Sequence, residues 1–162
     1  MSNEYSIVWS GPFYEDFNVG DIIKSGGSRT FSFADNIMVS AHTGDRTPAY
    51  LSEEIAKKTR HGKVVIHPIF AMQTVISLAV RDTSINSIAF LGAEYQKIVK
   101  PIFPGDTLRV ETEVVNKRDS KSHPEAGVVT WIHKGINQDN EVVVEIKRTN
   151  LVAKKNSGGK SE

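Results

Sequence analysis

The second half of the chain alternates apolar and polar residues. Beyond Asp82 this period of two is typical of half-buried strands, and it is clearest between residues 107 and 117. Residues that favour turns separate the alternating segments: Pro104-Gly105 fits a type II turn, and Gln138–Asn140 fits a tight hairpin turn. The pattern predicts four long strands, at Ile85–Val99, Thr107–Lys117, Gly127–Ile136 and Glu141–Val152.

The first half is mainly helical in pattern. Apolar spacing predicts a helix from Ala34 to His42, with Ile37 and Met38 on one face. A second helix is predicted over Ser52–Arg60, because a serine can cap it and its acidic and basic ends suit the helix dipole. Alternation at Arg29–Phe33 predicts a short strand, which follows a turn predicted at Gly26–Ser28.

The most apolar segment follows His67-Pro68. Proline suits the first turn of a helix, and His67 falls at or near the cap. From Ile69 to Val80 apolar residues occur almost all the way round, and a helix of this kind is buried. A curved antiparallel sheet can cover such a helix. The sequence therefore predicts an α+β hotdog fold, an antiparallel sheet wrapped around a long central helix, with small inserted helices.

Composition indicates one soluble domain. The 162 residues carry a formal net charge of +1, which gives no bulk attraction to nucleic acid or membranes. The absence of cysteine excludes disulfides and thiolate chemistry, and the start of the chain lacks a signal-peptide pattern. We expect a cytoplasmic protein with a single domain over residues 1–153 and a flexible tail over residues 154–162.

Candidate chemistry centres on the loop Thr43–Tyr50, where Asp45 lies between glycine and proline residues that can shape the backbone. Capping a turn is the simpler role for such an aspartate. His42 and His67 are the histidines that could reach Asp45, and His67 could also act only as a helix cap. The five histidines show no metal-ligand spacing, so no metal site is predicted.

Several segments together resemble the MaoC-like hydratase/dehydratase family, which includes R-specific enoyl-CoA hydratases and mesaconyl-CoA hydratases. Gly44-Asp45, Pro48 and Ala56 fit its signature of Gly-Asp-x-Asn-Pro-x-His followed by a small residue. The other similar segments are Phe13–Asp21, Ser84–Ala89, Lys100–Leu108 and Gly127–Val129.

The resemblance implies a mechanism in which an aspartate and a histidine five residues later hold the water that adds to an enoyl thioester. A backbone N–H at the start of the central helix would bind the thioester oxygen. This chain has Tyr50 at the histidine position, Thr47 at the asparagine position and Pro68 in place of a glycine N–H donor. The implied catalytic residues are Asp45, Tyr50 and His67.

The resemblance further implies an acyl-CoA substrate, bound by Arg46, Pro48, Pro68, Ile69 and Phe70. The predicted function is a hydro-lyase on a CoA thioester, with a branched or dicarboxylic acyl chain as one form of the substrate. No cofactor is expected beyond the CoA of the substrate, and hotdog sheets that pair edge to edge imply a homodimer. Two alternatives stay open: a catalytically impaired acyl-CoA-binding or partner subunit, and an acyl-CoA thioesterase.

A basic cluster follows the inserted helices, and it could contact the phosphates of CoA. A solvated helix end is the simpler interpretation of such charges. The cluster comprises Lys57, Lys58, Arg60 and Lys63.

Overall fold

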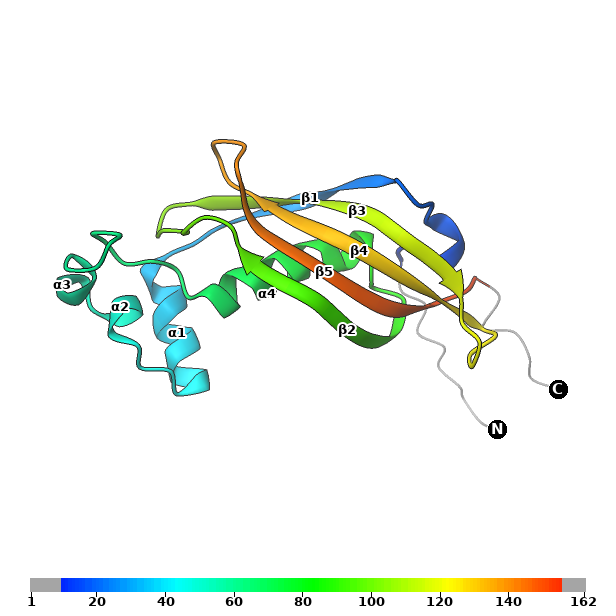
Figure 1. The fold of residues 1–162 in the computed structure, drawn as a ribbon, viewed down its shortest axis with the longest axis horizontal. Coiled ribbons are helices and arrows are strands. Elements are labelled where there is room, and N and C mark those ends of the chain that lie inside the picture. Colours follow the sequence, from blue (N-terminus) through cyan, green and yellow to red (C-terminus); the bar gives the residue numbers. More distant parts are fainter. Residues whose placement is uncertain (1–9, 156–162) are drawn as a thin grey trace.

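The structure, a computed structural model, describes residues 10–155; residues 1–9 and 156–162 lie outside the described part. Helix α4 (Pro68–Ala79) runs along the concave face of a curved five-stranded sheet (Figure 1). Every neighbouring pair of strands is antiparallel, in the order β1-β3-β4-β5-β2. The strands are β1 (Ile22–Thr30), β2 (Ser87–Ile98), β3 (Thr107–Asp119), β4 (Ala126–Ile136) and β5 (Val142–Ala153). The predicted α+β hotdog fold is confirmed.

The four strands predicted beyond Asp82 are present, with small shifts at their ends. The turn at Pro104-Gly105 is confirmed, because Gly105 has a positive φ of 99° and the Asp106 N–H donates to the Phe103 carbonyl. The turn predicted at Gly26–Ser28 is wrong. Those residues lie inside β1, where the pairing with β3 shifts register between Lys24 and Ser28, so the two glycines form an irregularity within one strand.

The strand predicted at Arg29–Phe33 is also wrong at its end, because Phe33 begins helix α1 (Phe33–Thr43). The Ser32 N–H donates to Asp35 Oδ2 at 2.8 Å, which satisfies a backbone donor at the start of the helix. This local bond ends the extended conformation.

The helix predicted over Ser52–Arg60 is only a single turn, α3 (Glu53–Ala56), and another single turn, α2 (Pro48–Leu51), precedes it. Ser52 caps α3 as predicted, since its hydroxyl accepts the Ile55 N–H at 3.3 Å. The helix ends early because the Thr59 hydroxyl and N–H both donate to the Ala56 carbonyl, at 2.7 and 3.0 Å, in place of the next helical bond.

Helix α4 supplies the centre of the core through Ala71, Val75 and Ala79, each fully buried against the sheet. The prediction that this helix is buried on every side is wrong at Ile69, which is 62% exposed. The sheet of one chain covers only part of the helix surface. His67 and Pro68 take the predicted cap and first-turn positions.

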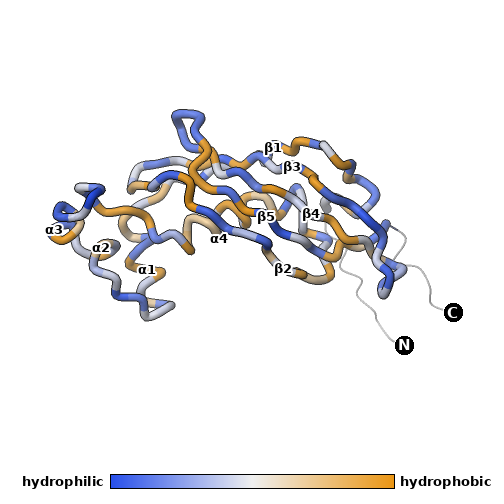
Figure 2. The backbone as a smooth tube through the Cα atoms, in the orientation of Figure 1, coloured by the Kyte–Doolittle hydropathy of each residue, from blue (hydrophilic) through white to orange (hydrophobic). Residues whose placement is uncertain are grey.

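The outer strand β2 is unusually apolar for an exposed edge. Polar residues gather at the β4–β5 turn and around α3, whereas polar and apolar stretches both occur along the strands (Figure 2). Because an edge strand offers unpaired backbone groups, apolar side chains along it favour pairing with another chain. The exposed apolar residues at this edge are Ile88, Phe90, Leu91, Ile98 and Val99. None of the helices between residues 10 and 155 has the length and apolarity needed to span a bilayer.

A buried polar cluster ties the sheet to the C-terminal end of α4. Arg148 Nε donates to His133 Nε2 at 2.7 Å, so neutral His133 carries its proton on Nδ1, which donates to Thr112 Oγ1 at 2.8 Å. The Arg148 guanidinium also donates to Ser84 Oγ at 2.9 Å, just beyond α4. Burial, together with the charge of Arg148, lowers the pKa of His133 to about 3.

The lowered pKa of His133 predicts a loss of stability in mild acid. An unfolded histidine binds a proton below about pH 6.5, whereas the folded protein resists protonation of His133 down to about pH 3. Stability from this group is complete above pH 6.5 and falls by about 1.4 kcal/mol for each pH unit below it. Urea unfolding at pH 7 and pH 5 should therefore show a smaller difference for His133→Gln than for wild type. The exposed His123 provides the control His123→Gln; an unchanged pH difference in His133→Gln would contradict the assignment.

Candidate active site

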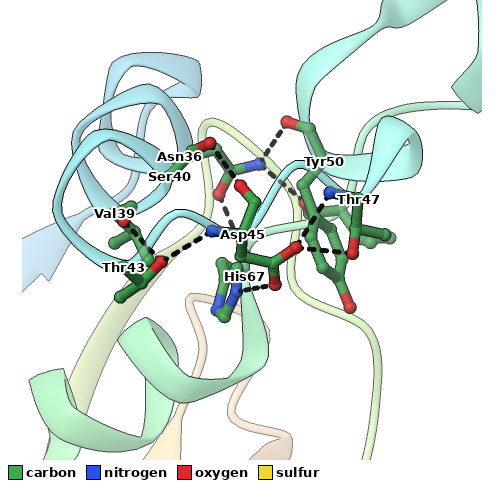
Figure 3. A network of polar contacts seen from close by, with 9 residues as sticks. Asn36, Val39, Ser40, Thr43, Asp45, Thr47, Tyr50 and His67 are labelled. Carbon is green, nitrogen blue, oxygen red and sulfur yellow. Dashed lines mark hydrogen bonds and ion pairs between the residues drawn. The ribbon is translucent and has the colours of Figure 1, made fainter.

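Asp45 follows the C-terminal end of helix α1 and lies beside the amino end of α4 (Figure 3). Gly44 ends α1 with a positive φ of 75°, a conformation that glycine adopts without steric cost. The Ser40 hydroxyl donates a short hydrogen bond to the Asp45 carbonyl. The main chain on both sides of Asp45 is therefore held by α1.

The Asp45 carboxylate has a different neighbour on each oxygen (Figure 3). Oδ1 accepts the Thr47 hydroxyl at 2.6 Å and the Thr47 N–H at 2.8 Å. Oδ2 lies 2.9 Å from His67 Nε2. The hydrogen bonds from the Thr47 hydroxyl, from His67 and from the Thr47 N–H lower the pKa of Asp45 to about 2. The group is thus an anion across the physiological range, and about a third of its side chain stays exposed.

His67 lies behind this carboxylate at the N-cap of α4, with its side chain 5% exposed. An ionised carboxylate can only accept, so His67 Nε2 must carry the proton of the contact with Asp45. His67 Nδ1 is buried and has no hydrogen-bond partner within residues 10–155. The structure therefore joins two of the three predicted catalytic residues, through a histidine 22 residues away from the aspartate.

Tyr50 packs its ring against the imidazole of His67, with ring centroids 4.9 Å apart. Tyr50 and Pro68 also line a pocket of about 270 Å³, whose wall includes neither Asp45 nor His67. Apolar side chains form most of its wall, and Arg60, His61 and Lys100 are its basic members. The other wall residues are Val65, Ile66, Ile98, Val99, Pro101 and Ile102.

The first turn of α4 offers backbone donors beside the pair of Asp45 and His67. Pro68 has no N–H, and the first N–H used inside the helix is that of Ala71, which donates to the His67 carbonyl at 3.0 Å. The N–H groups of Ile69 and Phe70 precede it, so neither has a helical partner. A helix N-terminus favours negative charge, which suits an oxygen that becomes anionic.

Other predicted residues lie near the site without joining the pair. Arg46 and Pro48 are exposed on the Asp45 loop, and the ring of Phe70 packs edge-on against Phe31 at 5.9 Å. His42 Nδ1 hydrogen-bonds the Met38 carbonyl one turn back in α1.

The basic cluster after α3 is partly engaged in local contacts. Lys57 pairs with Glu54 at 2.6 Å, and Lys63 lies 3.9 Å from the ring centre of Phe103. Arg60 instead lines the pocket beside Tyr50, with its Nε donating to His61 at 3.1 Å.

Sequence reasoning missed the contact of Thr47 with Asp45, and it missed Asn36 altogether. The Thr47 N–H donates to the Asp45 side chain two residues earlier, which is an Asx-turn. This local pattern could have been found from the spacing alone. Asn36 is buried in the first turn of α1 and binds main-chain atoms of Tyr50, Val65 and His67. Its partners are 14 to 31 residues away, so no local signal could identify it.

A hotdog fold with an aspartate loop at the amino end of the central helix defines the class of MaoC-like proteins. The family model of mesaconyl-CoA hydratase matches residues 6–161, and the chain belongs to this family of MaoC-like hotdog proteins.

Two curated relatives are longer than this chain. Mesaconyl-CoA hydratase of Cereibacter sphaeroides is 32% identical over 149 residues, which cover 91% of this chain and 43% of that protein. Beta-methylmalyl-CoA dehydratase of Chloroflexus aurantiacus is 32% identical over 90% of this chain and 41% of its own length. The crystal structure of the MaoC-like dehydratase from Rhodospirillum rubrum is 28% identical, with a TM-score of 0.79 over 90% of this chain and 99% of that one. The chain thus spans less than half the length of the two curated relatives and nearly all of the Rhodospirillum rubrum protein.

Proposed function

We propose that this protein is a hydro-lyase that adds water to, or removes it from, the conjugated acyl group of a CoA thioester. The contact of 2.9 Å between His67 Nε2 and Asp45 Oδ2 is the observation on which this proposal rests most heavily. It gives the chain a carboxylate and an imidazole in direct contact. The imidazole comes from His67, because the position where the family signature has its histidine is Tyr50 in this chain. The activities named for the family and its relatives agree with this chemistry.

In the proposed reaction, the exposed Asp45 carboxylate holds a water molecule and takes one of its protons as the water oxygen bonds to Cβ. The electron pair of the double bond moves onto the thioester oxygen, where the N–H groups of Ile69 and Phe70 stabilise the enolate. The pair of Asp45 and His67 then returns the proton to Cα, so no proton is gained or lost overall.

A short, branched or dicarboxylic acyl chain is the proposed substrate class. The pocket of about 270 Å³ beside Tyr50 suits a small group, and Arg60 lies in its wall. Arg46, exposed next to Asp45, is a second cation that could contact a substrate carboxylate. The proposal needs no cofactor other than the CoA of the substrate, and it keeps the cytoplasmic location expected from the sequence.

The experiment is a panel of mesaconyl-CoA and straight-chain enoyl-CoA substrates, followed by absorbance of the conjugated thioester and by a thiol reagent. Hydration removes the conjugated absorbance and leaves the thioester intact. Release of free CoA would instead identify a thioesterase. No turnover of any substrate would refute the hydro-lyase proposal.

A non-catalytic acyl-CoA-binding subunit is the second candidate. The observation that favours it is that the chain spans 43% of the mesaconyl-CoA hydratase and 41% of the beta-methylmalyl-CoA dehydratase described above, so a second hotdog unit could carry the remaining function. Saturable binding of an acyl-CoA without turnover, followed by turnover on addition of a partner chain, would distinguish this function from the first.

We further propose a homodimer formed through the apolar edge of β2. Phe90, 59% exposed on that edge, gives a direct test. Phe90→Lys should convert a dimer into a monomer in size-exclusion chromatography with light scattering, because a charge would be buried in the interface. Val19→Lys changes an equally exposed apolar residue outside β2 and should leave the dimer intact. A monomeric wild type, or a dimeric Phe90→Lys variant, would contradict the proposal.

A further inference from the structure

Asn36 joins the three segments that meet at the candidate active site. Its Nδ2 donates to the carbonyls of Tyr50 and Val65, and its Oδ1 accepts the His67 N–H, all at 2.9 Å. Asn36 is buried, with only 1% of its surface exposed. Rotating the amide would place its NH₂ against the His67 N–H, so the orientation is fixed.

Helix α1 depends on this amide for its position. Its apolar residues Ile37 and Met38 are exposed, whereas Asp35 and Asn36 are the residues it buries. The fully buried residues of α1 are thus polar, and the hydrogen bonds of Asn36 connect its first turn to the rest of the site. This inverts the usual amphipathic arrangement of a surface helix.

The same helix holds both members of the pair. Ser40, near its C-terminal end, binds the Asp45 carbonyl, and Asn36, in its first turn, binds the His67 N–H. Because one rigid helix makes both contacts, the distance between the Asp45 loop and the start of α4 is set by α1. Without the Asn36 amide, the His67 main chain would lose its hydrogen bond to α1.

We propose that Asn36 is a positioning residue that sets the contact between Asp45 and His67. Its kinetic consequence rests on the proposed hydro-lyase function, whereas its effect on the contact does not. Displacements of about 1 Å in a reacting pair can lower rates by about 10²-fold. We expect Asn36→Ala to reduce kcat by about 10- to 100-fold with a much smaller change in KM.

The activity-independent test follows the carboxyl carbon of Asp45 by NMR from pH 7 to pH 3. Wild type should show no titration in this range, because the pKa of Asp45 is about 2. In Asn36→Ala the His67 contact is weakened, so the Asp45 signal should begin to titrate within the range. Asn86→Ala is the matched control: the Asn86 amide also donates to two main-chain carbonyls, those of Gly11 and Pro12, and it should leave both the signal and kcat unchanged.

Asn36→Asp provides a second variant, since it keeps an acceptor for the His67 N–H and removes the donors to Tyr50 and Val65. If Asn36→Ala does not fold, the same titration is measured on Asn36→Asp. A folded Asn36 variant with the wild-type Asp45 signal would overturn the proposal, as would failure of both variants to fold, which would make Asn36 a residue of general stability. Absence of turnover in wild type would refute the hydro-lyase function alone and leave the titration as the test of positioning.

Discussion

Replacing Asp45 with asparagine is expected to lower kcat/KM for hydration of the best acyl-CoA substrate by about 10³-fold. The amide keeps the size of the side chain and can still accept the hydrogen bonds from Thr47. It cannot accept a proton from water. Initial rates from the loss of conjugated thioester absorbance give the measurement.

The pH dependence of wild type provides a further check on the role of Asp45. Because the pKa of Asp45 is about 2, its protonation cannot cause a loss of rate between pH 7 and pH 5. Asp139→Asn, in the exposed β4–β5 turn, is a charge-matched control that should retain full activity. Wild-type activity in Asp45→Asn would remove Asp45 from the mechanism.

His67→Gln is expected to lower kcat by about 10²- to 10³-fold, because it removes the imidazole that contacts Asp45. Tyr50→Phe keeps the ring that packs on His67 and removes only the hydroxyl, so we expect less than about a tenfold loss. Comparing the two variants decides which residue replaces the histidine expected at position 50.

If Tyr50→Phe lowers kcat more than His67→Gln does, the tyrosine would be the residue that donates the proton to the substrate. A severe loss in Tyr50→Phe with near-normal rates in His67→Gln would make the phenol the donor and the imidazole a helix cap. His42→Gln controls for the removal of a nearby imidazole, and it should have little effect because His42 bonds within its own helix.

The fold was largely predictable because its main signals are periodic. The alternation from residue 107 onward predicts a strand with one buried face, which is present, and the apolar segment after Pro68 predicts the central helix, which is present but not buried on every side. The failures occurred where local bonds outweigh periodicity: Asp35 ends the first strand by capping α1, and Thr59 ends α3 by taking the Ala56 carbonyl. Apolar periodicity does not detect either bond.

The site was less predictable because its members come from separate segments. The Asp45 loop is visible in the sequence, but the contact with His67 depends on how α1 is placed against the start of α4. Asn36 provides that placement through partners as far as 31 residues away. The exposure of Ile69 has a similar origin, since the sequence indicates an apolar helix but not how much of it one sheet can cover.

A double-mutant cycle on Asp45→Asn and His67→Gln tests most directly whether an aspartate of the inserted loop and a histidine of the central helix act as one unit. Residues that act together give non-additive losses, so the double variant should be no slower than the slower single variant, within about threefold. Losses that multiply across the cycle would mean that the two side chains act independently and would contradict the account.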